Sequence, residues 1–176
     1  MSTLSKLDVA NLIQSLRVLV VDDSPYMRKL VRNLLTNVGV RTVYEAVDGI
    51  DGLDSVRTLT PDIVILDWEM PLLNGAEFVR IVRSPGAFPS PNIPIVMLTS
   101  HRERWRVVEA ARLGVNEFLC KPVSARSLLD RVVAILANPR PFVQVGEFYR
   151  PEPRKGTLAS DADLGGSGAS SSSAAH

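Results

Sequence analysis

The sequence has a single cysteine in 176 residues, which excludes an internal disulfide and any zinc site built from several cysteines. It has no apolar run near the roughly 18 residues that a membrane-spanning helix needs, and its first 16 residues lack the basic start and apolar block of a secretion signal. Basic residues number 20 and acidic residues 19, so net charge gives no argument for a nucleic-acid or membrane partner. We therefore expect a cytoplasmic protein that binds neither.

The composition is that of one packed domain with short extensions, at 45% hydrophobic and 22% charged residues. We expect an N-terminal extension over residues 1–15 that could be helical, and a domain over 16–138. A Pro-rich and aromatic extension over 139–155 and a flexible Gly/Ala/Ser tail over 156–176 follow. Residues 142–149 could pack on the last helix of the domain, extend a sheet edge, or dock on a partner or second copy.

Four hydrophobic runs, at 18–23, 63–67, 95–99 and 115–121, each end in a polar group. Continuous β-branched and aliphatic runs of this length are typical of parallel strands that are buried on both faces. Segments with helical spacing separate these runs, and residues 41–46 form another short strand. Five strand–helix units predict an α/β fold with a doubly wound, five-stranded parallel sheet and helices on both faces.

Ligand sites in such folds lie beyond the carboxyl ends of the strands. The polar groups at these ends are Asp22, Asp23, Asp67, Thr99 and Lys121. Three carboxylates, a hydroxyl and an ammonium in one crevice favour a hard cation together with a phosphoryl group.

The order of these groups resembles the response-regulator receiver family. The resemblance rests on Asp22-Asp23, on Asp67 followed by 68–71 (Trp-Glu-Met-Pro) and Gly75, on Thr99-Ser100 and on Lys121-Pro122, and it covers about residues 16–137. It implies a flavodoxin-like (βα)5 domain that accepts a phosphoryl group from a sensor histidine kinase or phosphotransfer protein. Such a domain is a signalling module with self-catalysed phosphorylation and dephosphorylation, not an enzyme for a separate substrate.

The resemblance also implies the metal site. Asp67 would be the phosphoacceptor and nucleophile. The carboxylates of Asp23 and Asp67 and the backbone carbonyl of Glu69 would bind Mg²⁺, with Asp22 acting largely through water and Mn²⁺ as a plausible substitute.

Further residues would recognise and transmit the phosphoryl group. Lys121, before a cis Lys121-Pro122 bond, would pair with a phosphoryl oxygen. The Thr99 hydroxyl and the Ser100 backbone N–H would bind the group, and movement of Thr99 would draw Phe118 inward as a switch. The alternative for Phe118 is a static core side chain.

Two positions beside the site, Glu69 and His101, are expected to tune the lifetime of the acyl phosphate. The alternative is that both are solvated loop residues. In the fourth helix of the domain, expected over 102–113, Trp105 and Arg106 form the candidate partner surface for an unidentified downstream protein. A solvated basic face and a partly buried Trp105 are the alternatives there. A homodimer could form through the fourth helix, fifth strand and fifth helix, or through the C-terminal extension.

Three other classes of protein compete with this interpretation. A pseudo-receiver scaffold would have the same fold without phosphorylation, but the residue set is complete. An aspartyl-phosphate hydrolase of the haloacid dehalogenase type needs an Asp-x-Asp motif, whereas Asp22 and Asp23 are adjacent. A flavodoxin needs a phosphate-binding loop after the first strand, where these carboxylates would repel the cofactor phosphate.

Overall fold

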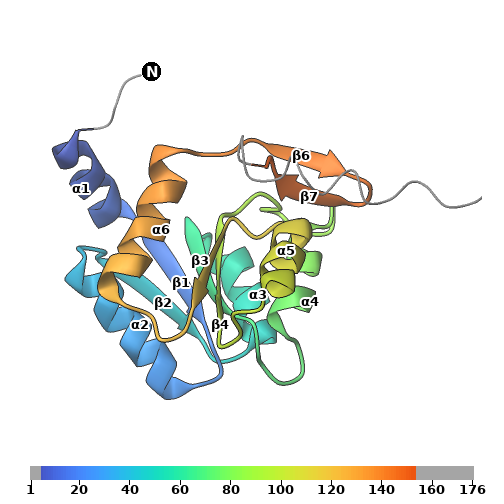
Figure 1. Ribbon diagram of the computed structural model, residues 1–176, viewed down its shortest axis with the longest axis horizontal. Helices are drawn as coiled ribbons and strands as arrows, with labels where there is room; N and C mark the ends of the chain where they lie inside the picture. Colours follow the sequence, from blue (N-terminus) through green and yellow to red (C-terminus); the bar gives the residue numbers. More distant parts are fainter. Residues whose placement is uncertain (1–4, 154–176) are drawn as a thin grey trace, which may run out of the picture.

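The computed structural model describes residues 5–153. The helices and strands alternate through most of the chain (Figure 1). In chain order they are α1 (Lys6–Ser15), β1 (Arg17–Val21), α2 (Pro25–Asn37), β2 (Thr42–Ala46), α3 (Gly49–Leu59), β3 (Ile63–Asp67), α4 (Gly75–Arg83), β4 (Ile95–Thr99), α5 (Arg104–Leu113), β5 (Glu117–Cys120), α6 (Ala125–Ala137), β6 (Phe142–Val145) and β7 (Phe148–Pro151).

The main sheet has five parallel strands in the order β2-β1-β3-β4-β5. The α/β doubly wound fold predicted from the sequence is therefore confirmed. The strand order reverses at β1. From β1 the chain goes to β2 on one side of it, and then to β3, which lies on the other side of β1. A ligand crevice is expected at the carboxyl ends of the strands beside such a reversal.

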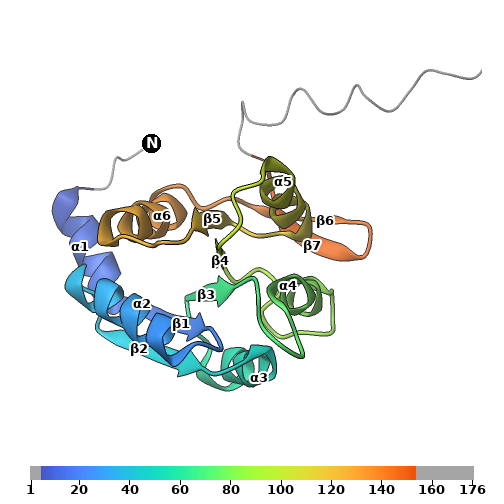
Figure 2. The same ribbon diagram turned by 60° about the horizontal axis from the view of Figure 1, so that its bottom comes forward.

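Helices cover both faces of the sheet (Figure 2), because alternate strand residues point to opposite sides. On one face Val18 and Val20 pack with α1, α2 and α6; on the other Leu19 and Val21 pack with α3, α4 and α5. β3 and β4 are buried at every position. No helix among the described residues is both long and apolar enough to cross a membrane.

Helix ends follow local sequence signals. Ser24 caps α2 and accepts from the Met27 N–H, with Pro25 in the first turn. Ser124 caps α6 and accepts from the Ser127 N–H. The helix expected over 102–113 begins two residues later, at Arg104, and its cap residue Glu103 makes no side-chain capping hydrogen bond.

Residues 142–151 form an antiparallel hairpin of their own, β6–β7, rather than extending the main sheet. The hairpin lies against α4 and the end of α5 (Figure 1). A Cβ on Gly114, the cap of α5 at φ +101°, would come within 2.9 Å of the Tyr149 carbonyl oxygen. The backbone of β7 therefore approaches α5 closely. The expected flexible tail over 156–176 lies outside the described residues.

A buried arginine ties the hairpin to the domain. The Arg83 side chain is 0% exposed. Its guanidinium donates to the Gly114 carbonyl at 3.0 Å, the Pro91 carbonyl at 2.7 Å and Asn116 Oδ1 at 3.1 Å, and Cζ lies 4.8 Å from the centroid of the Phe142 ring. Burial lowers the pKa of Arg83 to about 9, so the group stays charged at neutral pH. The hairpin thus supplies the aromatic wall of a cation cage.

Candidate functional site

The three aspartates meet at one edge of the sheet. Asp22 and Asp23 directly follow β1, and Asp67 is the last residue of β3. β1 and β3 are hydrogen-bonded neighbours with Val21 opposite Leu66, so their carboxyl ends lie side by side. One oxygen from each carboxylate lies within 4.8 Å of the other two. The convergence expected from the sequence is therefore present in the structure.

The surroundings of Asp22 fit a bound cation. This side chain is 1% exposed. Its Oδ1 accepts from the Ser24 N–H at 2.8 Å, whereas Oδ2 is buried with no hydrogen-bond partner among the described residues. A buried carboxylate oxygen that lacks a partner is costly unless an ion or a donor meets it. The oxygen-only donor set and the solvent-exposed Asp23 suit Mg²⁺, which keeps several waters.

Lys121 neutralises part of this charge from the end of β5. Its Nζ lies 2.9 Å from Asp67 Oδ1 and 3.7 Å from Asp22 Oδ2. The Lys121 backbone N–H donates to the Thr99 carbonyl at 2.7 Å, and the Lys121-Pro122 peptide bond is cis. The ammonium therefore offsets part of the negative charge of Asp22 and Asp67.

The pKa values describe a site with excess buried negative charge. The pKa of Asp67 is raised to about 6, mainly by burial; the hydrogen bond from Lys121 opposes the rise, and the Asp22 charge adds to it. Burial also raises the pKa of Asp22. For Lys121, burial favours a lower pKa, but the contacts with Asp67 and Asp22 outweigh it and raise the pKa. A divalent cation would relieve this repulsion.

Thr99 and Ser100 lie at the end of β4. Thr99 is 0% exposed, and its Oγ1 accepts from the His101 backbone N–H at 3.1 Å. Ser100 is exposed. The Thr99 hydroxyl keeps its own proton free to donate, which is what binding a phosphoryl oxygen requires.

Glu69 and His101 are in direct contact at the site. His101 Nε2 meets Glu69 Oε1, and His101 Nδ1 lies 3.6 Å from Glu103 Oε1. The side chains of Glu69 and His101 are 47% and 37% exposed, so this pair joins the loop after β3 to the loop after β4 at the surface. The sequence suggested both positions without indicating that they touch.

The residues proposed for the switch and the partner surface form a connected group. Phe118 is half-buried and meets the Trp68 ring edge to face, with centroids 6.5 Å apart. Trp105 is 58% exposed, so the alternative of a partly buried Trp105 fits the structure less well. The Arg106 Cζ atom lies 4.8 Å from the Trp105 centroid and 5.5 Å from that of Trp68.

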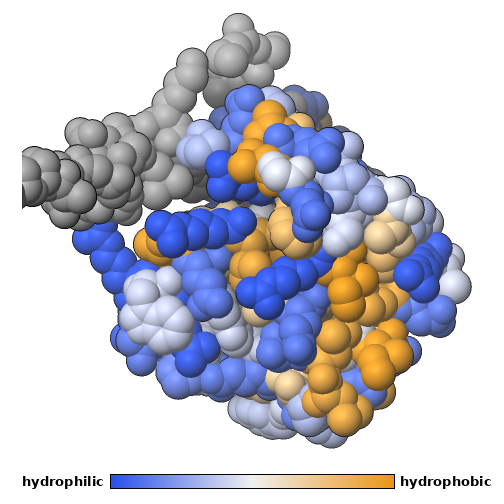
Figure 3. Space-filling view, turned by 90° about the vertical axis from the view of Figure 1, so that its right-hand side faces the viewer, coloured by the Kyte–Doolittle hydropathy of each residue, from blue (hydrophilic) through white to orange (hydrophobic). Residues whose placement is uncertain are grey.

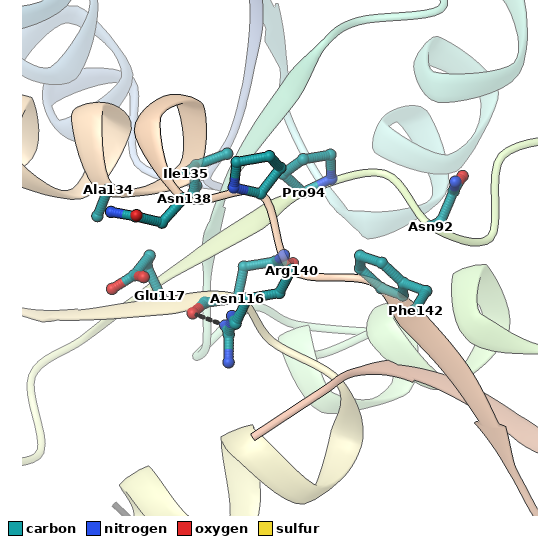
Figure 4. Close-up of a pocket in the computed structure, with 10 residues that line it drawn as sticks. Asn92, Pro94, Asn116, Glu117, Ala134, Ile135, Asn138, Arg140 and Phe142 are labelled. Carbon is teal, nitrogen blue, oxygen red and sulfur yellow. Dashed lines mark hydrogen bonds between the residues drawn. The ribbon is translucent and has the colours of Figure 1, made fainter. Parts of the chain in front are cut away.

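A cavity of about 180 Å³ lies at the opposite end of the sheet (Figure 4). Several of its polar lining groups already have partners among the described residues. Arg140 donates to the Asn116 carbonyl (Figure 4) and to the Glu152 carbonyl, and Glu117 pairs with Arg131 at 3.4 Å. This cavity contains no cluster of carboxylates like that of the acidic site.

Two residues that sequence reasoning did not single out support the site. Arg28 Nη1 donates to the Asp22 backbone carbonyl at 2.8 Å and holds the loop after β1. Trp68 directly follows β3, is 7% exposed and contacts both Phe118 and Arg106. Arg28 lies on the helix face next to the aspartates, but only the fold brings Trp68 and Arg106 together.

Comparisons with known proteins agree with this architecture. The response regulator receiver domain family matches residues 18–133. The chain is 32% identical to the chemotaxis protein CheY-3 of Vibrio cholerae over 123 residues. This aligned region is 70% of this chain and 93% of that protein. It is also 32% identical over 120 residues to the chemotaxis protein CheY of Pseudomonas aeruginosa, which covers 68% of this chain and 95% of that protein.

Two solved structures share the fold. Vibrio cholerae chemotaxis protein CheY4 has a TM-score of 0.60 at 32% identity, covering 66% of this chain and 95% of that one. The receiver domain of the Francisella response regulator 1452 has a TM-score of 0.60 at 26% identity, covering 67% and 93%. With its acidic cluster, its lysine and its sheet order in place, the chain belongs to the response regulator receiver domain family.

Proposed function

We propose that this chain is a stand-alone response regulator whose Asp67 accepts a phosphoryl group from a sensor histidine kinase or phosphotransfer protein in the cytoplasm. The observation that carries the proposal is the Asp67 carboxylate, buried 2.9 Å from Lys121 Nζ within a cluster of three aspartates. The curated CheY relatives align over 93% and 95% of their own length, which supports a receiver role for the matched domain as a whole.

Phosphoryl transfer to a carboxylate depends on positioning and on neutralising charge. The carboxylates of Asp22, Asp23 and Asp67 and the backbone carbonyl of Glu69 would hold Mg²⁺, or Mn²⁺ in its place, and the ion would neutralise charge on the phosphoryl oxygens. Asp67 attacks phosphorus as the bond to the donor nitrogen breaks. Lys121 then pairs with a phosphoryl oxygen from the position it already occupies beside Asp67.

The phosphorylated state is read by the group at the end of β4. The Thr99 hydroxyl and the Ser100 backbone N–H bind the new phosphoryl oxygens. In the structure Thr99 Oγ1 accepts from the His101 N–H. When Thr99 moves from this position toward the phosphoryl group, it leaves room for Phe118 to turn inward. The change reaches a partner surface at Trp105 and Arg106, where an unidentified downstream protein or a second copy of the chain binds.

The Glu69–His101 pair sets the lifetime of the phosphorylated form. Both side chains lie at the surface beside the acceptor and contact each other, so they lie on the route by which water reaches the acyl phosphate. Replacing either residue with alanine is expected to change the half-life of the phosphorylated protein without changing which residue is modified. An unchanged half-life in both variants would leave them as solvated loop residues.

The proposal is tested with acetyl phosphate and Mg²⁺, followed by measurement of the intact mass. Wild type is expected to gain one phosphate-sized adduct, Asp67→Ala none, and wild type with excess EDTA much less. The Asp62→Ala variant serves as a control, because Asp62 lies at the other end of β3. A wild-type protein that gains no adduct would instead be a pseudo-receiver scaffold, and an adduct retained in Asp67→Ala would refute the assignment of the acceptor.

A further inference from the structure

The guanidinium of Arg106 lies between two indole rings. Its Cζ is 5.5 Å from the Trp68 centroid on the inner side and 4.8 Å from the Trp105 centroid on the outer side. Trp68 is 7% exposed and Trp105 58%. These are the two tryptophans of the sequence. A planar guanidinium stacks on aromatic faces in a way that an ammonium does not, so Arg106 links a buried ring to an exposed one.

The inner ring is attached to the acceptor site. Trp68 directly follows Asp67, and its backbone N–H donates to the Leu98 carbonyl at 2.9 Å, one residue before Thr99. The same ring meets Phe118 edge to face at an interplanar angle of 76°. Trp68 is therefore in direct contact with Phe118 and is hydrogen-bonded to β4 one residue before Thr99.

The helix that carries the outer ring has few buried contacts. Glu103, which precedes α5, makes no side-chain capping hydrogen bond, although its carboxylate lies 3.6 Å from His101 Nδ1, and Ala110 is the one buried residue of this helix. The other end of α5 is fixed at Gly114, beside the Arg83 guanidinium and the Tyr149 carbonyl. Arg106, in the first turn, thus attaches the amino-terminal end of α5 to the buried Trp68 ring, beside the contact between Glu103 and His101.

This attachment has an energetic cost. The Arg106 Nε is buried and has no hydrogen-bond partner within the described part of the chain. A buried donor without a partner favours any rearrangement that returns it to water. Stacking on Trp68 offsets this cost only while the face of the Trp68 ring remains available. The contact between Arg106 and Trp68 can therefore form in one state of the domain and break in the other.

Resting on the function proposed above, we propose that Arg106 is a positioning residue that couples occupancy of Asp67 to the exposure of Trp105. When Phe118 turns inward, the edge of the Trp68 ring loses its neighbour, and the ring tilts into the vacated space. Its face is then withdrawn from Arg106, the guanidinium turns outward, and Trp105 loses its stacking partner. Figure 3 shows the side of the molecule toward α4 and α5, where hydrophobic residues gather in a band beside hydrophilic ones. The aromatic contact on this side thereby changes.

The test follows both rings by ¹⁹F NMR in the full chain labelled with 5-fluorotryptophan. Single Trp68→Phe and Trp105→Phe variants assign the two signals. Spectra are recorded with Mg²⁺ before and after excess acetyl phosphate, and the phosphorylated fraction is measured by intact mass so that proteins are compared at equal occupancy. In wild type both signals are expected to shift on phosphorylation, and the Trp105 signal is expected to become more sensitive to solvent isotope exchange.

The variants separate coupling from simple structural support. In Arg106→Gln the Trp68 signal is expected to shift as in wild type, while the Trp105 shift falls at least threefold. Arg106→Lys, which keeps the charge but not the plane, is expected to resemble Arg106→Gln. Arg104→Gln, an exposed arginine on the same helix, is the matched control and is expected to behave as wild type.

Each remaining outcome contradicts a specific claim. A Trp105 shift of wild-type size in Arg106→Gln, or a phosphorylated wild type whose Trp105 signal does not move, overturns the coupling and leaves the acceptor assignment intact. Loss of the Trp68 response in Arg106→Gln at equal occupancy also overturns it, because the proposed order runs from Trp68 to Arg106. A wild type that gains no phosphate overturns the proposed function, and this inference with it.

Discussion

Replacing Asp67 with asparagine is expected to stabilise the metal-free protein, although the residue is central to the proposed chemistry. The wild-type carboxylate is 3% exposed, and burial is the largest cause of its raised pKa. A raised pKa means that the folded state disfavours the charged form relative to the unfolded state. Asparagine keeps the shape of the side chain and removes that charge.

The magnitude follows from the pKa of about 6 in the folded state against 3.8 for the free group. At about 1.36 kcal/mol per pKa unit, the ionised carboxylate costs about 3 kcal/mol at pH 7. The pKa of about 6 already includes the opposing hydrogen bond from Lys121, so no separate correction for that contact is made. The stabilisation is about 3 kcal/mol, or a rise of about 6–12 °C in Tm for a chain of this size.

The sign of the pH dependence is fixed by the same shift. Above pH 7 both states are ionised and the penalty is complete. As the pH falls through 6 the folded state binds a proton that the unfolded state does not bind until about 3.8, so the penalty declines. Metal-free wild type should therefore gain stability relative to Asp67→Asn between pH 7 and about pH 4.5.

Urea unfolding in EDTA, followed by circular dichroism at several pH values, measures this difference. Asp130→Asn, an exposed aspartate on α6, is the control and should change stability by less than about 0.5 kcal/mol. Added Mg²⁺ should stabilise wild type more than Asp67→Asn, which reverses the order seen in EDTA. If Asp67→Asn is less stable than wild type at pH 7 without metal, the account of uncompensated buried charge is wrong.

Three further predictions concern the supports of the site and of the hairpin. Phe142→Ala should lower the free energy of unfolding in urea by about 2 kcal/mol, because it removes the ring over Arg83. The loss should be clearly smaller in an Arg83→Met background, where no cation packs against the ring. An equal loss in both backgrounds would contradict the role of Phe142 in the cage around Arg83. Gly75→Ala should destabilise the protein by several kcal/mol, because a Cβ would come within 2.7 Å of the Asp67 carbonyl oxygen; wild-type Tm would show that the backbone gives way easily. Lys121→Met should raise the pKa of Asp67 above about 6, since the Lys121 hydrogen bond opposes the effect of burial; carboxyl ¹³C NMR titration without metal measures it.

The sequence was sufficient to predict the sheet and the acidic crevice, because both depend on local signals. Strands buried on two faces leave runs such as 63–67 with no polar residue before the final Asp67. Each polar group lies at the carboxyl end of its strand, so alignment of the strands brings these groups together. Their convergence can therefore be predicted without information on contacts between residues far apart in the sequence. The cis Lys121-Pro122 bond followed from the family resemblance.

Contacts between side chains on separate elements could not be predicted in this way. Arg83 lies at the end of an amphipathic helix, where an arginine side chain is ordinarily solvated. Its burial involves Phe142, which lies 59 residues later in the sequence. Phe142 belongs to a hairpin that no strand periodicity had indicated. The stacking of Arg106 on Trp68 likewise requires the exact angle between α5 and β3. The late start of α5 at Arg104 reflects Glu103, a poor capping residue whose influence a periodicity argument overlooks.

The cage around Arg83 has a practical consequence for how the folding unit is defined. The family match ends at residue 133, so a boundary drawn from homology alone would discard β6 and β7. A chain cut there would leave a guanidinium that is 0% exposed in the whole domain without its aromatic wall and open to water at the amino-terminal end of the sheet. We therefore propose that the folding unit extends through β7, which ends at Pro151, and fragments ending at the homology boundary should show lower yield and lower protease resistance than those that retain the hairpin.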